Sequence, residues 1–122
     1  MVTTLLLLNV CHWAGDFTHL STNWMLDAKR FGKPFLPIFI HAGVHATLFF
    51  ICITLLHGLD AGLLAAAIQL PTHFAIDVWK GRMNGWFKNL QDPTNKYHWW
   101  LFGFDQWLHQ LVIITTTYFV CC

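Results

Sequence analysis

The sequence predicts an all-α integral membrane protein, a four-helix bundle with an internal two-fold repeat and a short amphipathic helix at the membrane surface. Apolar residues make up 56% of the 122 residues and charged residues only 11%, whereas a soluble domain carries about 25% charged residues. Four stretches are apolar over the roughly 20 residues that a bilayer-spanning helix needs. In addition, all seven Lys and Arg residues fall in two of the connections between these stretches.

The four predicted transmembrane helices belong to one domain that covers residues 1–122. They extend approximately over residues 2–25, 35–57, 59–79 and 99–121. Pro34 and Pro37 open the second helix, and His57-Gly58-Leu59-Asp60 predicts a tight turn between the second and the third. Pro71 lies within the third helix, where we expect it to kink the helix or to interrupt its backbone hydrogen bonds.

The basic residues predict how the helices are oriented. They are Lys29, Arg30 and Lys33 in the first connection, and Lys80, Arg82, Lys88 and Lys96 in the third. Because basic loops stay in the cytoplasm, both of these connections are expected there and both termini on the other side. The prediction is a multi-pass protein of a bacterial-type inner membrane.

The third connection also has a helical pattern of its own. Met83, Trp86, Phe87 and Leu90 follow the i, i+3, i+4, i+7 spacing of one helix face, next to basic residues. This pattern predicts an amphipathic helix over residues 82–91 that lies on the cytoplasmic leaflet. It would anchor the chain there, or cover a site that opens on that face.

Each predicted transmembrane helix contains one pair of histidine or aspartate residues four positions apart. The pairs are His12 and Asp16, His41 and His45, His73 and Asp77, and Asp105 and His109. Side chains at i and i+4 share a helix face, with Cβ atoms about 6 Å apart, so that both can bind one ion. Counted at 1.5 Å per residue, all four pairs lie roughly 6 to 16 Å inside the cytoplasmic ends of their helices. The sequence therefore predicts one metal-binding layer of eight side chains.

The His12-x-x-x-Asp16 pair recurs as His73-x-x-x-Asp77 half a chain later, which predicts two halves related by an axis along the membrane normal. Eight ligands in such an arrangement suit one or two divalent ions, with Zn, Mn or Fe as candidates. An aspartate at mid-bilayer costs about 2.5–3.5 kcal/mol on insertion scales, so three of them favour a bound cation. A proton or ion path and a purely structural polar network remain open as alternatives.

Several short motifs follow one another in a fixed order along the chain. They are His12-x-x-Gly15-Asp16-Phe17, Asn23-Trp24-Met25, Lys29, His41-x-x-x-His45, His73-x-x-x-Asp77 and Asp105-Gln106-x-x-His109. Together they resemble an uncharacterised family of small bacterial and phage membrane proteins, a domain of unknown function. The family pattern has a glutamine shortly after the position of Phe17, where this chain has Thr18-His19-Leu20. More distantly, the layout resembles bacterial membrane-bound metal-dependent hydrolases, although their Pro-Asp-x-Asp-His element is absent here.

These observations predict a membrane-embedded metal-dependent enzyme, and the distant resemblance implies hydrolysis by analogy. The expected substrate is a lipid or a lipid-linked ester or phosphoester near the cytoplasmic leaflet. The five histidines of the pairs would bind the metal, whereas Asp16, Asp77 and Asp105 would bridge ions or act as the general base, with Asp16 and Asp105 as the catalytic candidates. The alternatives are a metal- or proton-handling membrane protein, a homo-oligomer, or a small subunit that modulates a host membrane complex. The net charge of +1 and the lack of a basic stripe argue against a nucleic-acid partner.

Overall fold

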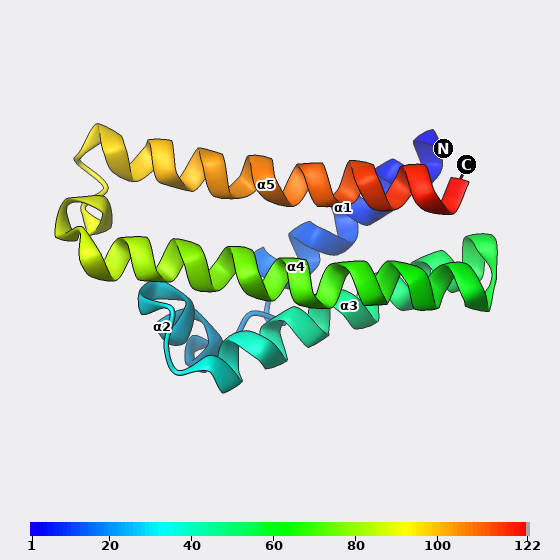
Figure 1. The fold of residues 1–122 in the computed structure, drawn as a ribbon, viewed down its shortest axis with the longest axis horizontal. Coiled ribbons are helices and arrows are strands. Elements are labelled where there is room, and N and C mark those ends of the chain that lie inside the picture. The colour runs from blue at the N-terminus through cyan, green and yellow to red at the C-terminus, as the bar shows by residue number, and fades with distance from the viewer. Residues whose placement is uncertain (122) are drawn as a thin grey trace.

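The computed structural model describes residues 1–121, which form five α-helices and one short 3-10 helix (Figure 1). The α-helices are α1 (Val2–Phe17), α2 (Asn23–Phe31), α3 (Phe35–His57), α4 (Leu59–Trp86) and α5 (Lys96–Cys121), and the 3-10 helix is η1 (Lys88–Gln91). The predicted all-α class is confirmed. Two of the helices, α3 and α4, are long and apolar enough to cross a membrane.

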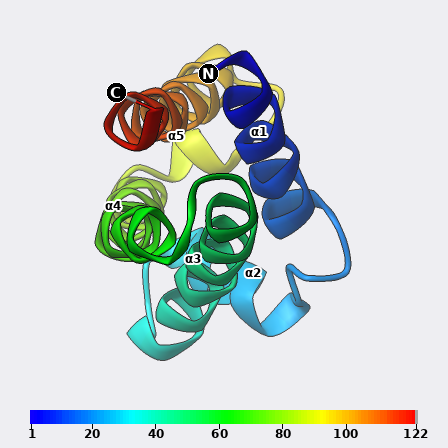
Figure 2. The ribbon, with the colours of Figure 1, turned by 90° about the vertical axis from the view of Figure 1, so that its right-hand side faces the viewer.

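The four longer helices pack against one another, and α2 lies beside them. Helix α3 contacts both α1 and α4, while α5 contacts α4 and α1 (Figure 2). The N-terminus, the end of α5 and the turn between α3 and α4 lie at one end of the molecule (Figure 1). The connection through η1 lies at the other end, and α2 lies in that half as well. All seven basic residues therefore lie in the half that is remote from the termini.

The predicted first helix over residues 2–25 is wrong, because α1 ends at Phe17 and a separate helix follows. The Thr18 hydroxyl hydrogen-bonds back to the carbonyl of Ala14 and so competes with the helical backbone bonds. Thr22 then caps the N-terminus of α2, with its hydroxyl 3.4 Å from the backbone N–H of Met25. With 16 residues, α1 is only about 24 Å long.

The predicted surface helix over residues 82–91 is also wrong. Helix α4 continues through Pro71 and beyond residue 79 as far as Trp86, and the backbone then leaves the helical conformation at Phe87. Met83 and Trp86 therefore belong to the last turns of α4, whereas Leu90 belongs to η1. Helix α3 has the predicted bounds, and α5 begins three residues before its predicted start.

Close backbone packing holds α2 against α4. A Cβ atom at Gly81 of α4 would collide with the backbone nitrogen of Gly32 and the backbone oxygen of Lys29, so only glycine permits this approach. Gly32 ends α2 with φ 69°, a left-handed conformation that favours glycine. Its carbonyl accepts a hydrogen bond of 3.2 Å from Arg82 Nε. These contacts fix α2, and with it the side chain of Lys29, relative to α4.

A layer of buried apolar side chains fills the half of the molecule that contains the termini. Leu8 of α1, Phe49 and Ile53 of α3, Ala65 of α4 and Ile113 of α5 are at most 1% exposed and form one cluster. Each lies on the terminal side of the histidine or aspartate pair in its own helix. This apolar layer therefore closes the interior of the molecule toward the end with the termini.

Candidate metal centre

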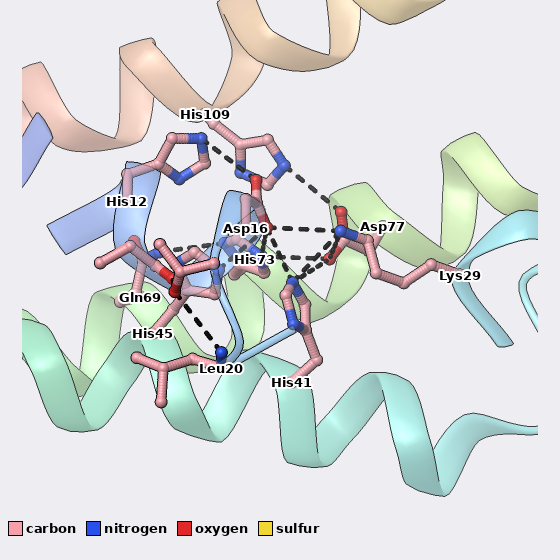
Figure 3. Close-up of polar contacts among 12 residues, drawn as sticks. His12, Asp16, Leu20, Lys29, His41, His45, Gln69, His73, Asp77 and His109 are labelled. Carbon is pink, nitrogen blue, oxygen red and sulfur yellow. Dashed lines mark hydrogen bonds and ion pairs between the residues drawn. The ribbon is translucent and has the colours of Figure 1, made fainter. Parts of the chain in front are cut away.

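All eight side chains that the sequence predicts as metal ligands are buried together in the interior. None of them is more than 8% exposed. Helix α1 contributes one pair, and α3, α4 and α5 contribute the others; Figure 3 shows seven of the eight side chains pointing toward one another. They are His12, Asp16, His41, His45, His73, Asp77, Asp105 and His109. We call this set the His/Asp cluster.

The i, i+4 pairs are in contact within their own helices. The Nε2–carboxylate distance is 3.3 Å for His12 and Asp16, 3.1 Å for His73 and Asp77, and 3.3 Å for His109 and Asp105. The rings of His41 and His45 also meet, with centroids 4.7 Å apart. The predicted shared helix faces are therefore present in all four helices.

Asp16 joins three helices at the centre of the cluster (Figure 3). Its Oδ1 atom lies 2.8 Å from His41 Nε2 and 3.0 Å from His45 Nε2, both on α3. The same oxygen lies 3.3 Å from Lys29 Nζ on α2. The close approach of α1 to α3 depends on Gly15, where a Cβ atom would lie 2.6 Å from His45 Cε1.

Asp77 and Asp105 connect α4 and α5 on the other side of the cluster. Asp77 Oδ1 lies 3.4 Å from His109 Nε2, and Asp77 Oδ2 lies 3.6 Å from His41 Nε2. Lys80 Nζ, one turn further along α4, lies 3.2 Å from Asp105 Oδ2. The contacts of Asp16, Asp77 and Asp105 thus link all four helices into one network.

The donor atoms of the cluster form three overlapping groups, and within each group they lie within 4.8 Å of one another. The groups are Asp16, His41, His45 and His73; His12, His73 and His109; and Asp77, Asp105 and His109. Ligands on a tetrahedral ion at about 2.0–2.1 Å lie roughly 3.4 Å apart, so small side-chain movements would bring each group around an ion. His73 and His109 each belong to two groups, which makes the three groups one continuous site.

Several donor atoms of the cluster have no hydrogen-bond partner within residues 1–121. These atoms are His73 Nε2, Asp77 Oδ2, Asp105 Oδ1 and His109 Nε2. His73 Nε2 pairs with Asp77 Oδ2, and His109 Nε2 pairs with Asp105 Oδ1, at ion-pair distance. Neither pair has the geometry of a hydrogen bond. Leaving a buried polar atom without a partner costs about 1–3 kcal/mol. Imidazole nitrogen and carboxylate oxygen are good ligands for Zn, Mn and Fe. The buried cluster can therefore hold a divalent ion.

Two glutamines hold histidines of the cluster from outside. Gln69 Nε2 on α4 lies 3.0 Å from His73 Nδ1, and Gln106 Oε1 on α5 lies 3.2 Å from His12 Nε2. A hydrogen bond to one ring nitrogen of a ligating histidine fixes the ring and leaves the other nitrogen for the metal. Gln69 leaves Nε2 of His73 free in this way, whereas Gln106 engages Nε2 of His12. The role of Gln69 was not predicted from the sequence.

Lys29 is the main functional candidate that sequence reasoning missed. Its Nζ atom lies 3.3 Å from Asp16 Oδ1, 3.2 Å from His41 Nε2 and 3.8 Å from Asp77 Oδ2. Burial lowers the pKa of the Lys29 ammonium, but Asp77, Asp16 and Asp105 outweigh this effect and raise the pKa above its ordinary value. Lys29 is therefore a permanent positive charge at the edge of the cluster, and not only a basic loop residue.

A cavity of about 360 Å³ borders the cluster. Among residues 1–121, Asp16, Asp77 and Asp105 line it, whereas no histidine of the cluster does. Phe17, Leu26 and Phe102 are among the residues that supply apolar parts of the wall. The three carboxylates thus separate the histidines from the cavity, so that a molecule in the cavity meets the carboxylates first.

The comparisons with known proteins give one match. The sequence model of a protein family described as "Protein of unknown function (DUF3307)" matches residues 2–122. No curated protein and no solved structure matches the chain. The match confirms the predicted resemblance to an uncharacterised family, and the function has to be inferred from the geometry of the site.

Proposed function

We propose that this chain, which belongs to the DUF3307 family, is a membrane-embedded metal-dependent hydrolase of a lipid or lipid-linked ester or phosphoester. One observation carries the proposal: a fully buried His/Asp cluster meets a cavity through its three carboxylates. A purely structural metal site is closed on all sides, whereas a catalytic site keeps access for water and substrate. The three overlapping donor groups favour two ions over one.

The five histidines of the cluster, assisted by Asp77, would hold the metal. A divalent ion in this position supplies Lewis-acid activation of water and of an ester oxygen at neutral pH. Asp16 and Asp105 lie between the histidines and the cavity, where they can take up and return a proton. Lys80 and Gln106 contact Oδ2 of Asp105 at 3.2 and 3.1 Å, which orients this carboxylate, while its Oδ1 faces His109 Nε2 at 3.3 Å.

The apolar layer favours an enzyme over an ion path. Ion pathways are lined by polar and ionisable residues, but buried apolar side chains, Leu8, Phe49, Ile53 and Ile113, fill the route from the cluster toward the termini. The cavity opens the cluster on the opposite side, where Lys29 and Lys80 line its wall. Access from one side suits a substrate that enters and leaves by the same route.

The proposed membrane topology has four spanning helices, α1, α3, α4 and α5, with both termini on the non-cytoplasmic side of the inner membrane. All seven basic residues lie in the half remote from the termini, which supports this orientation. Reporter fusions after Cys122 and near Arg30 test it. We expect cytoplasmic reporter activity only from the fusion near Arg30, and cytoplasmic activity from the fusion after Cys122 would contradict the topology.

A metal and activity assay on the purified protein tests the proposed function. We expect the protein to hydrolyse chromogenic ester or phosphodiester reporters, to lose this activity with a chelator, and to regain it with Zn or Mn. Asp105→Asn should lower the rate about 100-fold or more, because a general base contributes about 10²–10⁴-fold. Asp27→Asn is the matched control, since Asp27 is exposed on α2. A wild-type protein that contains no metal and hydrolyses none of the reporters would refute the proposal.

A further inference from the structure

Three cationic side chains line the same cavity as the three carboxylates. Lys29 and Arg30 come from α2, and Lys80 comes from α4. All three are close enough to share one cavity of about 360 Å³. Ion pairs with carboxylates account for Lys29 and Lys80 while the cluster is empty, but no carboxylate among residues 1–121 accounts for Arg30.

The charge balance of this cavity depends on what the carboxylates bind. In the structure, Lys29 is paired with Asp16 at 3.3 Å and Lys80 with Asp105 at 3.2 Å. Arg30 has no carboxylate partner within residues 1–121, and its guanidinium lies 5.3 Å from the centroid of the Phe31 ring. This step rests on the proposed function: once the carboxylates serve a divalent ion, the cations keep donors for an anion.

The wall of the cavity combines these charges with apolar surface. Phe17 at the end of α1, Leu26 on α2 and Phe102 on α5 line the same cavity as the cations. The Lys80 ammonium lies 4.9 Å from the centroid of the Phe102 ring, so charge and hydrocarbon adjoin directly. A ligand that satisfies both carries a compact anionic group next to an apolar chain.

We propose that the cavity binds a phosphate-bearing ligand, with Arg30 and Lys80 as the residues that hold the phosphate and Phe17, Leu26 and Phe102 as the surface for an attached apolar chain. Guanidinium and ammonium groups recognise phosphate oxygens through charge-assisted hydrogen bonds. The substrate of the cluster is then a phosphoester and not a neutral ester. A lipid phosphate and a free phosphate ion share this chemistry.

Binding to the purified protein in detergent tests the proposal, with metal content measured in every sample. The probes are dioctanoyl phosphatidic acid, dioctanoylglycerol, which has the same chains but no phosphate, and inorganic phosphate, titrated by calorimetry. We expect phosphatidic acid to bind at least about tenfold more tightly than dioctanoylglycerol, since hydrogen bonds to charged groups are the strong ones. Tighter binding of phosphatidic acid than of inorganic phosphate supports the proposal with a lipid as the source. Equal binding supports it with the free ion as the source.

Arg30→Gln and Lys80→Gln should each weaken binding of phosphatidic acid about tenfold. Lys33→Gln is the matched control, because Lys33 follows α2, carries the same charge and does not line the cavity. Equal losses in Arg30→Gln and Lys33→Gln would show diffuse surface attraction and overturn the proposal. So would equal affinities for phosphatidic acid and dioctanoylglycerol.

The binding assay separates this inference from the proposed function, because it does not require turnover. A protein that hydrolyses a neutral ester but binds phosphatidic acid no more tightly than the lipid without phosphate would overturn the inference. The same result would still agree with the proposed hydrolase function. A protein that selects phosphatidic acid but hydrolyses nothing would support the inference and refute the hydrolase.

Discussion

Replacing His73 by alanine should remove nearly all the metal from the purified protein. His73 belongs to two of the three donor groups, and its unpartnered Nε2 atom lies 3.1 Å from Asp77 Oδ2 and 3.8 Å from Asp16 Oδ1. Removing it therefore weakens two groups at once. Since even residues behind the ligands change metal affinity 10–100-fold, we expect occupancy to fall to about one tenth or less. Elemental analysis of the purified variants measures the effect.

His19→Ala is the control for this experiment, because His19 is exposed just after α1 and lies outside the cluster. Its metal content should equal that of the wild type. His73→Gln preserves a polar side chain of similar size, so a loss of metal in both His73 variants would not reflect misfolding. Full occupancy in a His41→Ala/His109→Ala double variant would contradict a site shared between helices.

Lys29→Met should destabilise the metal-free protein strongly and the metal-loaded protein little. Without metal, Lys29 is the cation shared by Asp16 and Asp77, and removing one partner from a buried ion pair costs about 3–5 kcal/mol. With metal, the bound ion would supply the missing charge, and we expect the cost to fall to that of an ordinary weak ion pair, about 0–1 kcal/mol. Thermal unfolding in detergent micelles, with and without a chelator, measures both values.

Lys33→Met provides the matched comparison for Lys29, with an expected change within about 0.5 kcal/mol in either state, because Lys33 is exposed. The difference between the two metal states is the decisive quantity. If Lys29→Met lowers the unfolding temperature equally with and without chelator, a metal ion does not replace the charge of Lys29 beside Asp16 and Asp77.

Local spacing was enough to predict the cluster, because its geometry follows from the helix itself. The i, i+4 pairs His12–Asp16 and His73–Asp77 must share a helix face once their segments are helical, and their similar depth predicted that they would meet. Helix α3 was predicted with its bounds because Pro34 and Gly58 flank an uninterrupted apolar segment. The predicted pseudo-two-fold relation between the halves stays a prediction.

The predicted first helix was too long because the polar residues that cap α2 lie next to apolar residues. Thr22 is a helix N-cap and Gly32 a left-handed C-cap, so the sequence did contain the boundaries of α2. The apolar residues that continue to Met25 nevertheless suggested one long helix. The role of Lys29 could not be predicted locally, because it depends on the backbone contact between Gly32 and Gly81, 49 positions apart in the chain. Spacing alone does not reveal such a contact.

The apolar layer of Leu8, Phe49, Ile53 and Ile113 has an electrical consequence. Moving one elementary charge through a potential of 100 mV changes its free energy by about 2.3 kcal/mol. In the proposed membrane topology this layer would separate the cluster from the far side of the membrane, so most of the voltage would fall across apolar side chains and little across the route from the cavity. A divalent ion that entered through the cavity would then cross almost none of the field. We therefore expect metal uptake to be insensitive to whether the membrane is energised.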